Sequence, residues 1–371
     1  MSFKSLGLSE EIIRAVQKMG YKEPFKIQTE AIPVILSGSN VIALAKTGSG
    51  KTAAFVLPIL QKLLNQKKVR NIISVLILVP TRELALQVDD EIAKFGAFLG
   101  NSIKHKVVFG GVSINPQMTG LRTGADILVA TPGRLLDLMG RNAVNLNSVH
   151  TVVFDEADRM LDMGFSKDIK KISSQFPLKK QTLLFSATMD KEVMATTLGH
   201  YHNSVIIGEE EEKVSVDQID QCIYFVEASE KMDTLISILN SNEAKQVLVF
   251  SSMKHHADSV GKKLVKAGIM AEVLHGDKSQ GARVRALTGF KNGTVRVLIA
   301  TDLASRGIDI IDLPLVINYE LPRSPADYIH RIGRTGRAGK NGKAISLVCP
   351  DEKAHMKLIE KRMGKTVRVC S

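Results

Sequence analysis

The length, composition and charge of the chain limit what it can be. Its 371 residues exceed one typical domain and suit two, each able to bury its own core. No stretch of about twenty uninterrupted apolar residues occurs, and the N-terminus lacks the apolar segment of a signal peptide. This pattern predicts neither a membrane span nor a secreted chain. A net charge of +12 favours a polyanionic partner, and the scarcity of aromatic residues indicates contacts to a nucleic-acid backbone rather than base stacking.

Three cysteines, Cys222, Cys349 and Cys370, lie far apart in the sequence. Neither their spacing nor their odd number is typical of a metal site or a disulfide framework. We therefore expect reduced thiols in a cytoplasmic protein.

In chain order, two blocks alternate short apolar runs with amphipathic helical stretches. The runs predict buried strands in the first block at residues 41–44, 74–79, 127–130, 149–154 and 182–185. In the second block they predict strands at 246–250, 271–274, 295–300, 315–319 and 344–348. Between strands, a helix is expected over residues 83–99. Continuous apolar strands separated by helices indicate an α/β fold with parallel sheets covered on both faces.

The acidic run at residues 209–212 interrupts this alternation. A solvated charge run between two repeated blocks predicts an interdomain linker. The expected organisation is a first domain at 1–207, an acidic linker at 208–217 and a second domain at 218–371.

Polar residues follow the predicted strands of both blocks. In an open parallel sheet, ligands bind outside the carboxyl ends of the strands. In the first block, one such cluster lies between a strand and a helix and is rich in glycine, which lets backbone N–H groups surround a phosphate. Lys51 would bridge the terminal phosphates and Thr52 would offer its hydroxyl to Mg²⁺. The cluster consists of Ala45, Lys46, Thr47, Gly48, Ser49, Gly50, Lys51 and Thr52.

The sequence Asp155-Glu156-Ala157-Asp158 closes another predicted strand. A carboxylate at this position can hold Mg²⁺ in a phosphate-loop enzyme, and its neighbour can deprotonate an attacking water. We interpret Asp155 as the metal anchor and Glu156 as the general base. Seen alone, the same four residues also suit a solvated acidic turn or a helix cap.

The second block holds a segment rich in cations and glycine at residues 330–337. Phosphoryl transfer needs positive charge on the developing γ-phosphate, and Arg334 and Arg337 could supply it if two domains closed. A surface basic patch or a plain RNA contact is the alternative interpretation.

Four motifs of the chain occur in an order that is typical of the DEAD-box RNA helicases. They are the phosphate loop, the Asp-Glu-Ala-Asp sequence, Ser186-Ala187-Thr188 and residues 330–337. Further motifs of that family are present at residues 20–28, 80–85, 110–111, 131–134, 275–283 and 301–309, so the chain resembles the family over essentially its whole length. Residues 108–117 and 158–165 resemble its bacterial RhlE branch.

This resemblance implies two tandem RecA-like domains and assigns roles to individual residues. Phe3 and Tyr21, in an adenine-reading segment at 1–29, would pack near the adenine, and Gln28 would hydrogen-bond its edge. Asp309 would lie near the ribose. The residues that would couple the ATP state to domain closure are Asp158, Ser186, Thr188 and His330. Those that would contact RNA phosphates and sugars are Thr81, Arg82, Gly111, Thr131, Gly133, Arg134, His275, Gly276, Gln280, Arg283 and Thr301.

The predicted function is ATP-dependent RNA unwinding, with ATP and Mg²⁺ as cofactors and RNA bound through its backbone without sequence specificity. Candidate protein partners are those of ribosome assembly or RNA decay. A nucleic-acid clamp that uses ATP without separating strands would need the same residues, and the residues alone leave DNA open as a substrate. A small-molecule kinase is disfavoured, since the second block shows no substrate pocket.

The chain departs from the family pattern at four positions. Phe25 and Lys26 replace a usual Thr and a small residue or Pro. Lys46 replaces a usual Gln, and Ser305 a usual Ala. None of these changes removes a group that the chemistry needs, so we expect an active enzyme.

Overall fold

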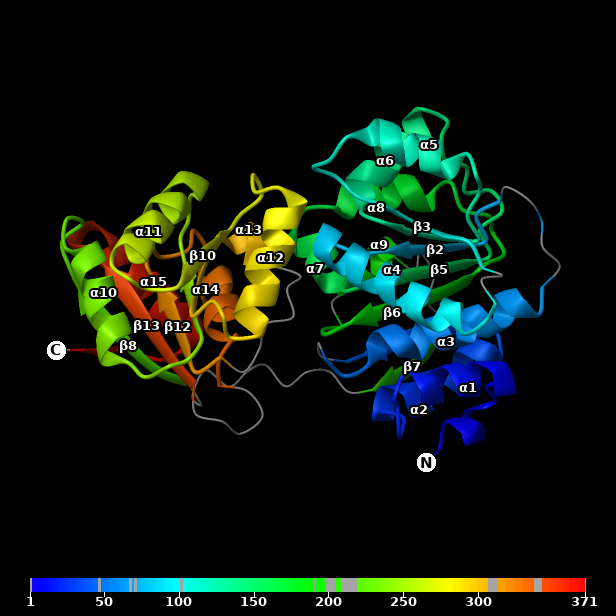
Figure 1. Ribbon diagram of the computed structural model, residues 1–371, viewed down its shortest axis with the longest axis horizontal. Coiled ribbons are helices and arrows are strands. Elements are labelled where there is room, and N and C mark those ends of the chain that lie inside the picture. Colours follow the sequence, from blue (N-terminus) through cyan, green and yellow to red (C-terminus); the bar gives the residue numbers. More distant parts are fainter. Residues whose placement is uncertain are drawn as a thin grey trace. The chain divides into compact units, whose positions relative to one another are not determined.

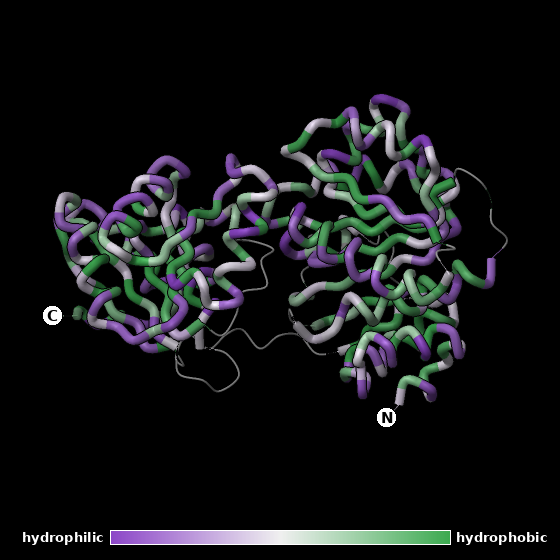
Figure 2. The backbone as a smooth tube through the Cα atoms, viewed as in Figure 1, coloured by the Kyte–Doolittle hydropathy of each residue, from purple (hydrophilic) through white to green (hydrophobic). Residues whose placement is uncertain are grey.

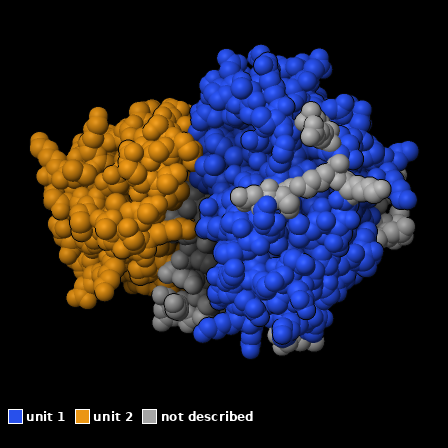
Figure 3. Space-filling view, turned by 45° about the vertical axis from the view of Figure 1, so that its right-hand side comes forward, with its two compact units in different colours: residues 1–211 blue, residues 212–371 orange. Residues whose placement is uncertain are grey.

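The computed structural model describes residues 2–45, 48–66, 69, 72–100, 103–189, 191–197, 204–208, 219–305, 313–336 and 342–370. The chain divides into two compact units, Met1–Glu211 and Glu212–Ser371, which Figure 3 colours separately. Within the described ranges, no helix is both long and apolar enough to cross a membrane.

Unit 1 is built on a seven-stranded parallel sheet with the order β3-β4-β2-β5-β6-β1-β7 (Figure 1). Its central strands are short apolar runs, such as Val-Leu-Ile-Leu in β2, and are buried on both faces. The strands are β1 Asn40–Leu44, β2 Val75–Leu78, β3 His105–Val108, β4 Ile127–Ala130, β5 Thr151–Asp155, β6 Gln181–Ser186 and β7 Ser204–Gly208.

Helices cover both faces of this sheet. Alternate strand residues divide the core into two clusters, one packed against α1–α4 and the other against α5–α9. The helical elements are η1 Phe3–Leu6, α1 Glu10–Lys18, α2 Lys26–Leu36, α3 Lys51–Leu64, α4 Arg82–Ala97, α5 Ile114–Leu121, α6 Pro132–Gly140, α7 Ala157–Asp162, α8 Ser166–Ser173 and α9 Lys191–Thr197.

Unit 2 repeats the design with the strand order β10-β11-β9-β12-β13-β8-β14, again all parallel. Its strands are β8 Ile219–Phe225, β9 Val247–Phe250, β10 Ala271–Leu274, β11 Val297–Ala300, β12 Leu315–Asn318, β13 Gly342–Val348 and β14 Arg368–Val369. Its helical elements are α10 Lys231–Ser241, α11 Lys254–Lys266, α12 Gln280–Lys291, α13 Asp302–Ser305, α14 Pro325–Ile332, η3 Pro350–Glu352 and α15 Lys353–Met363. Helices α10 and α11 pack on one face of the sheet and α12 to α15 on the other.

The α/β fold with two parallel sheets covered by helices is confirmed, as is the expectation of two tandem RecA-like domains. Figure 2 shows hydrophobic residues concentrated on the strands inside each unit and hydrophilic residues on the outer helices and loops. Strands β3, β7, β8 and β14 were not predicted from the sequence.

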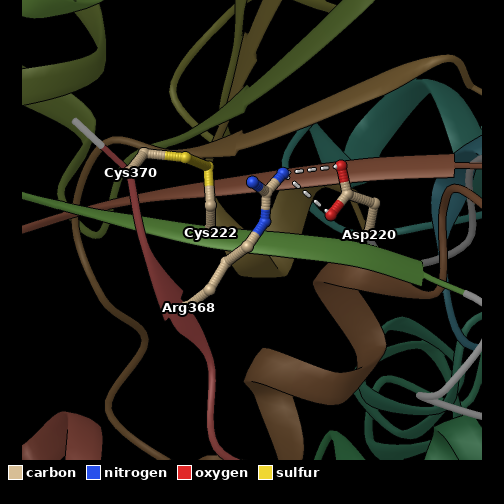
Figure 4. Close-up of a disulfide and its surroundings, with 4 residues drawn as sticks. All are labelled: Asp220, Cys222, Arg368 and Cys370. Atoms are coloured by element: carbon tan, nitrogen blue, oxygen red, sulfur yellow. Dashed lines mark hydrogen bonds and ion pairs between the residues drawn. A yellow bond between two sulfur atoms is a disulfide. The ribbon is translucent and has the colours of Figure 1, made fainter.

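The expectation of three reduced cysteines is wrong for two of them. Cys222 lies in β8, and Cys370 follows β14, which pairs with β8 so that Val369 lies opposite Ile223. The two cysteines form a disulfide with a Cα–Cα distance of 5.6 Å (Figure 4). Cys349 is a buried free thiol. The separation of 148 residues between Cys222 and Cys370 hid their proximity in the sequence.

Without reductant, replacing Cys370 by serine is expected to lower the free energy of unfolding of unit 2 by about 2–4 kcal/mol. The reason is that the disulfide restricts the unfolded chain. Chemical denaturation of both proteins measures the difference. With dithiothreitol present, the two midpoints should coincide, since the reduced wild type has no cross-link. An equal stability of both proteins without reductant would contradict the prediction.

Candidate functional site

The carboxyl edge of the unit 1 sheet brings three predicted elements together. Strands β5, β6 and β1 are neighbours, with Asp155 opposite Phe185 and Ser186 opposite Leu44. The phosphate loop follows β1, the acidic motif ends β5, and Ser186 ends β6. Segments more than a hundred residues apart in the sequence therefore share one edge, as expected for a ligand site of a parallel sheet.

Lys51 and Asp155 are both buried at this edge. The Lys51 ammonium donates a hydrogen bond to the Ala45 carbonyl at 2.9 Å. Asp155 is 2% exposed, and burial raises the pKa of its carboxyl to about 7, although Lys51 acts in the opposite direction. A carboxylate so poorly solvated is stabilised by a cation, which suits a metal anchor.

Within the described residues, no cluster of three or more His, Cys, Asp or Glu side chains could hold a metal ion. Magnesium, however, is usually held by one or two carboxylates, with water and substrate phosphates completing its shell. Asp155 beside a phosphate loop fits that mode of binding.

Glu156 has an unusual backbone conformation. Its φ of 51° places it in the left-handed region, which costs a non-glycine residue energy and is common at functional sites. Its amide donates to Asp155 Oδ1 at 3.0 Å, and its Oε2 accepts a hydrogen bond from Arg159 at 2.8 Å. The sequence interpretation missed Arg159, which lies one helical turn further along α7 and orients this carboxylate.

Asp158 connects the acidic motif to the segment after β6. Its Oδ2 accepts a hydrogen bond from the amide of Ala187 at 3.0 Å, and Ser186 Oγ accepts one from the amide of Thr188 at 3.4 Å. The structure thus brings together the unit 1 residues predicted to couple the ATP state to closure. His330, the fourth, belongs to α14 in unit 2.

Gln28 is completely buried at the start of α2. Its Oε1 accepts a hydrogen bond from the amide of Phe25 at 3.0 Å, and its Nε2 donates to the Gly50 carbonyl at 3.0 Å. The side chain therefore ties the N-terminus of α2 to the phosphate loop.

Phe3 and Tyr21 lie in a hydrophobic cluster with α4. Phe3 is 5% exposed, and its ring centroid lies 6.3 Å from that of Tyr21. The Tyr21 ring also contacts Phe95, and its hydroxyl donates to Glu91 at 2.9 Å. In this conformation both rings support the fold of the adenine-reading segment.

The candidate RNA-contact residues of unit 1 follow β2, β3 and β4, which are neighbours in the sheet. Thr81 caps α4 by accepting a hydrogen bond from the Leu84 amide at 3.3 Å. The Arg82 guanidinium lies directly against Gly111, where a β-carbon would meet Arg82 Nη1 at 2.7 Å. Any larger residue at position 111 would displace this arginine.

Thr131, Gly133 and Arg134 begin α6, just after β4. Arg134 is 8% exposed and donates from Nη2 to the Val112 carbonyl at 2.8 Å. In the described part of the chain, its buried Nε and Nη1 have no hydrogen-bond partner. Arg134 Nε lies 3.9 Å from Asp137 Oδ2, an ion pair without a hydrogen bond. Buried donors without a hydrogen bond are costly, so this guanidinium is suited to donate to a ligand oxygen.

In unit 2, the candidate RNA-contact residues follow β10 and β11. His275 is buried, with its Nε2 3.1 Å from Asp258 Oδ2, and its carbonyl accepts a hydrogen bond from Arg283 at 3.0 Å. Asp258 also pairs with Lys278 at 2.7 Å. Asp258, which the sequence interpretation missed, holds His275 at the end of β10.

Gln280 and Thr301 complete this group. Within the described ranges, neither Nε2 nor Oε1 of Gln280 has a hydrogen-bond partner, although both atoms are buried. Thr301 is 7% exposed at the end of β11, beside β10. Gly276 follows His275 directly.

Arg331 forms the centre of a buried network at the carboxyl edge of the unit 2 sheet. It is 2% exposed, and its Nε and Nη2 donate to the Asp302 carboxylate at 2.5 and 2.7 Å. Its Nη1 donates to Asn318 Oδ1 and the Glu320 carbonyl, and its guanidinium stacks 4.9 Å from the Phe250 ring. The sequence interpretation assigned no role to this arginine.

Arg334 lies three residues further on and is 7% exposed. Some positions singled out in the sequence lie outside the described residues: Arg337, Asp309, Lys46, Thr47 and the acidic run at 209–212.

The chain matches two family models, "DEAD/DEAH box helicase" over residues 25–196 and "Helicase conserved C-terminal domain" over residues 230–339. It is 40% identical over 360 residues to the DEAD-box ATP-dependent RNA helicase CshA of Geobacillus kaustophilus, covering 97% of this chain and 76% of that protein. It is also 40% identical to the ATP-dependent RNA helicase CshA of Listeria monocytogenes, covering 99% of this chain and 69% of the relative.

Among solved structures, the chain is similar to S. cerevisiae Dbp5 bound to RNA and ADP BeF3, with a TM-score of 0.78 and 32% identity over 100% of this chain and 95% of Dbp5. A DEAD box protein from Methanococcus jannaschii is 40% identical over 100% of this chain and 99% of its own, with a TM-score of 0.51. The motifs, their placement at the sheet edges and these relatives agree: the chain belongs to the DEAD-box RNA helicase family.

Proposed function

We propose that this protein is an RNA-stimulated ATP hydrolase that separates short RNA duplexes locally and without sequence specificity. The main support for this proposal is the carboxyl edge of the unit 1 sheet. There, buried Lys51 and Asp155 lie beside the carboxylate of Glu156, which is held by a hydrogen bond from Arg159. This set offers a cation for phosphates, a metal anchor and a base, which are the parts that ATP hydrolysis requires.

Within this proposal, Asp155 and the Thr52 hydroxyl would hold Mg²⁺, largely through water. The ion supplies positive charge that neutralises the phosphates when it is bound. Lys51 binds the terminal phosphates, and Glu156 accepts a proton from the attacking water.

The proposed RNA contacts are those named for each unit. They are supported by the buried polar atoms of Arg134 and Gln280 that have no hydrogen-bond partner among the described residues. Short hydroxyls, glycines and arginines bind phosphates and sugars rather than base edges. RNA affinity should therefore fall steeply with salt and differ little among sequences.

Steady-state ATP hydrolysis with and without RNA, beside an unwinding assay on a short duplex, tests the proposed function. RNA-stimulated hydrolysis with strand separation supports it. Hydrolysis without strand separation would instead favour an ATP-dependent clamp. A matched DNA duplex in the same assay decides between RNA and DNA.

We further propose that ATP and RNA cooperate through closure of the two units. Lys51, Asp155 and Glu156 belong to unit 1, whereas Arg334 and Arg337 belong to unit 2, so neither unit carries a complete set of groups for phosphoryl transfer. The binding of ATP would then be coupled to the RNA-contact residues through Asp158, Ser186, Thr188 and His330.

A non-hydrolysable ATP analogue is therefore expected to raise RNA affinity by about 5- to 150-fold, corresponding to a coupling of about 1–3 kcal/mol. RNA must raise the affinity for the analogue by the same factor. Titrations of labelled RNA with and without the analogue measure this coupling. Equal affinities would rule out the closure proposal whatever the rate of hydrolysis.

Gln28→Ala is expected to reduce the preference for ATP over GTP by about tenfold, the worth of one or two lost hydrogen bonds. The reason is that the Gln28 side chain is hydrogen-bonded to Phe25 and to Gly50 of the phosphate loop. Competition binding with ATP and GTP measures the ratio. If the variant loses affinity for both nucleotides equally, Gln28 has only a supporting role in this segment.

We also propose that the chain belongs to the bacterial RhlE branch, which the segments at 108–117 and 158–165 resemble. A cytoplasmic location and partner proteins of ribosome assembly or RNA decay are further parts of this proposal. Affinity purification from a cell extract, with and without RNase, would test the partners.

A further inference from the structure

Phe25 stands out among the residues near the phosphate loop. It is the N-cap residue of α2, where Ser, Thr, Asn or Asp would accept a hydrogen bond from the first turn of the helix. A phenylalanine gives up that interaction. Its side chain is nevertheless 53% exposed, so core packing does not explain its presence.

The Phe25 ring lies against the phosphate loop. A β-carbon on Gly50 would lie 2.8 Å from Phe25 Cδ2 and 2.5 Å from Gln28 Nε2, so both side chains pack closely against this glycine. Gly50 has a φ of 85° and precedes Lys51, the first residue of α3. The ring thus packs beside Gly50 of the proposed phosphate loop, and about half of its surface is exposed.

The other two aromatic residues of this segment are used elsewhere. Phe3 is buried, and Tyr21 is held by Phe95 and by its hydrogen bond to Glu91. Phe25 instead presents an aromatic surface to solvent next to residues that would bind phosphates.

We propose that Phe25 forms an aromatic wall of the base subsite and stacks on the purine ring of the bound nucleotide, an inference that rests on the proposed ATP-dependent function. Stacking depends on the π-face that every purine has. Phe25 should therefore contribute affinity for adenine and guanine nucleotides alike, whereas discrimination between them lies with Gln28.

The protein contains no tryptophan, so Phe25→Trp introduces a single fluorescent reporter at this position. Its emission is expected to change on binding ADP or GDP, but not on binding inorganic tripolyphosphate, which has no base. Phe98→Trp is the matched control, since Phe98 is 41% exposed at the other end of α4 from the candidate site. Its emission should not respond to any of these ligands.

Phe25→Ala complements the reporter. It is expected to weaken ADP and GDP binding by the same factor, about 5- to 100-fold, as measured by calorimetry on the full chain. The KM for ATP should rise, and kcat at saturating ATP should change little, because stacking holds ground state and transition state equally.

Calorimetry on the wild type separates the possible failures. If the wild type does not bind ADP, the proposed function itself fails. If it binds ADP but Phe25→Ala binds with the same affinity, the stacking proposal is overturned. An equal fluorescence response to tripolyphosphate and ADP also overturns it, because the ring would then report on the phosphates.

Discussion

Glu156→Gln is expected to leave ATP binding nearly intact and to lower turnover by roughly 10²–10⁴-fold, the usual contribution of a positioned general base. The amide keeps the size of the side chain and can still accept a hydrogen bond from Arg159, so the left-handed turn should persist. What is lost is the ability to take a proton from water. The measurement is steady-state ATP hydrolysis at saturating RNA, with calorimetry for ATP affinity.

Glu11→Gln is the matched control for this variant, because Glu11 is an exposed carboxylate of α1 in the same unit. It should hydrolyse ATP at the wild-type rate. Near-normal hydrolysis by Glu156→Gln would remove Glu156 as the base, whereas weakened ATP binding would indicate a role in holding the nucleotide instead.

The central strands of both sheets could be predicted from the sequence because they are buried on both faces. Residues 127–130, for example, match β4 in full. The edge strand β10, which is only partly buried, was also predicted at its observed bounds, 271–274. The missed strands lie at or beside a sheet edge, where one side contacts solvent and the apolar run is interrupted. Strand β7 exposes Val205 and Ile206, and β14 has only two residues. Their pairing depends on the rest of the sheet rather than on local pattern.

The candidate site was predictable where chemistry is coded in contiguous motifs. Lys51, Asp155 and Glu156 each follow a strand, so their convergence could be expected from sheet topology. Arg159 and Asp258 were missed because each acts through another side chain, and their charges resemble those of any solvated helix face. What distinguishes them is their pairing with Glu156 and His275, which only the folded chain brings about.

Arg331 shows the same limit most clearly. Five residues around it in the sequence are cationic or glycine (His330, Gly333, Arg334, Gly336 and Arg337), so the segment was interpreted as a source of charge for phosphate or RNA. The fold instead buries this guanidinium between Asp302, Asn318 and the Phe250 ring. The ends of three adjacent strands of unit 2, β11, β9 and β12, are thereby joined.

Arg331→Met is expected to lower the free energy of unfolding of unit 2 by about 3–5 kcal/mol, the cost of removing one partner from a buried ion pair. The methionine replaces much of the packing volume, but the Asp302 carboxylate loses both guanidinium bonds and buried Asn318 loses a donor. Urea denaturation, with hydrogen exchange to assign the transition to unit 2, measures the change. Arg331→Lys should recover little, because an ammonium cannot reproduce the bidentate geometry.

Arg368→Ala provides the matched control, since Arg368 makes a similar pair with Asp220 at 3.0 Å but with side chains 60% and 52% exposed. Removing that surface pair should cost less than about 1 kcal/mol. Adding Asp302→Asn to Arg331→Met should restore part of the lost stability, because it removes the charge left without its guanidinium partner. If the single Arg331→Met variant were as stable as the Arg368→Ala control, the buried network would not be what holds these strand ends together.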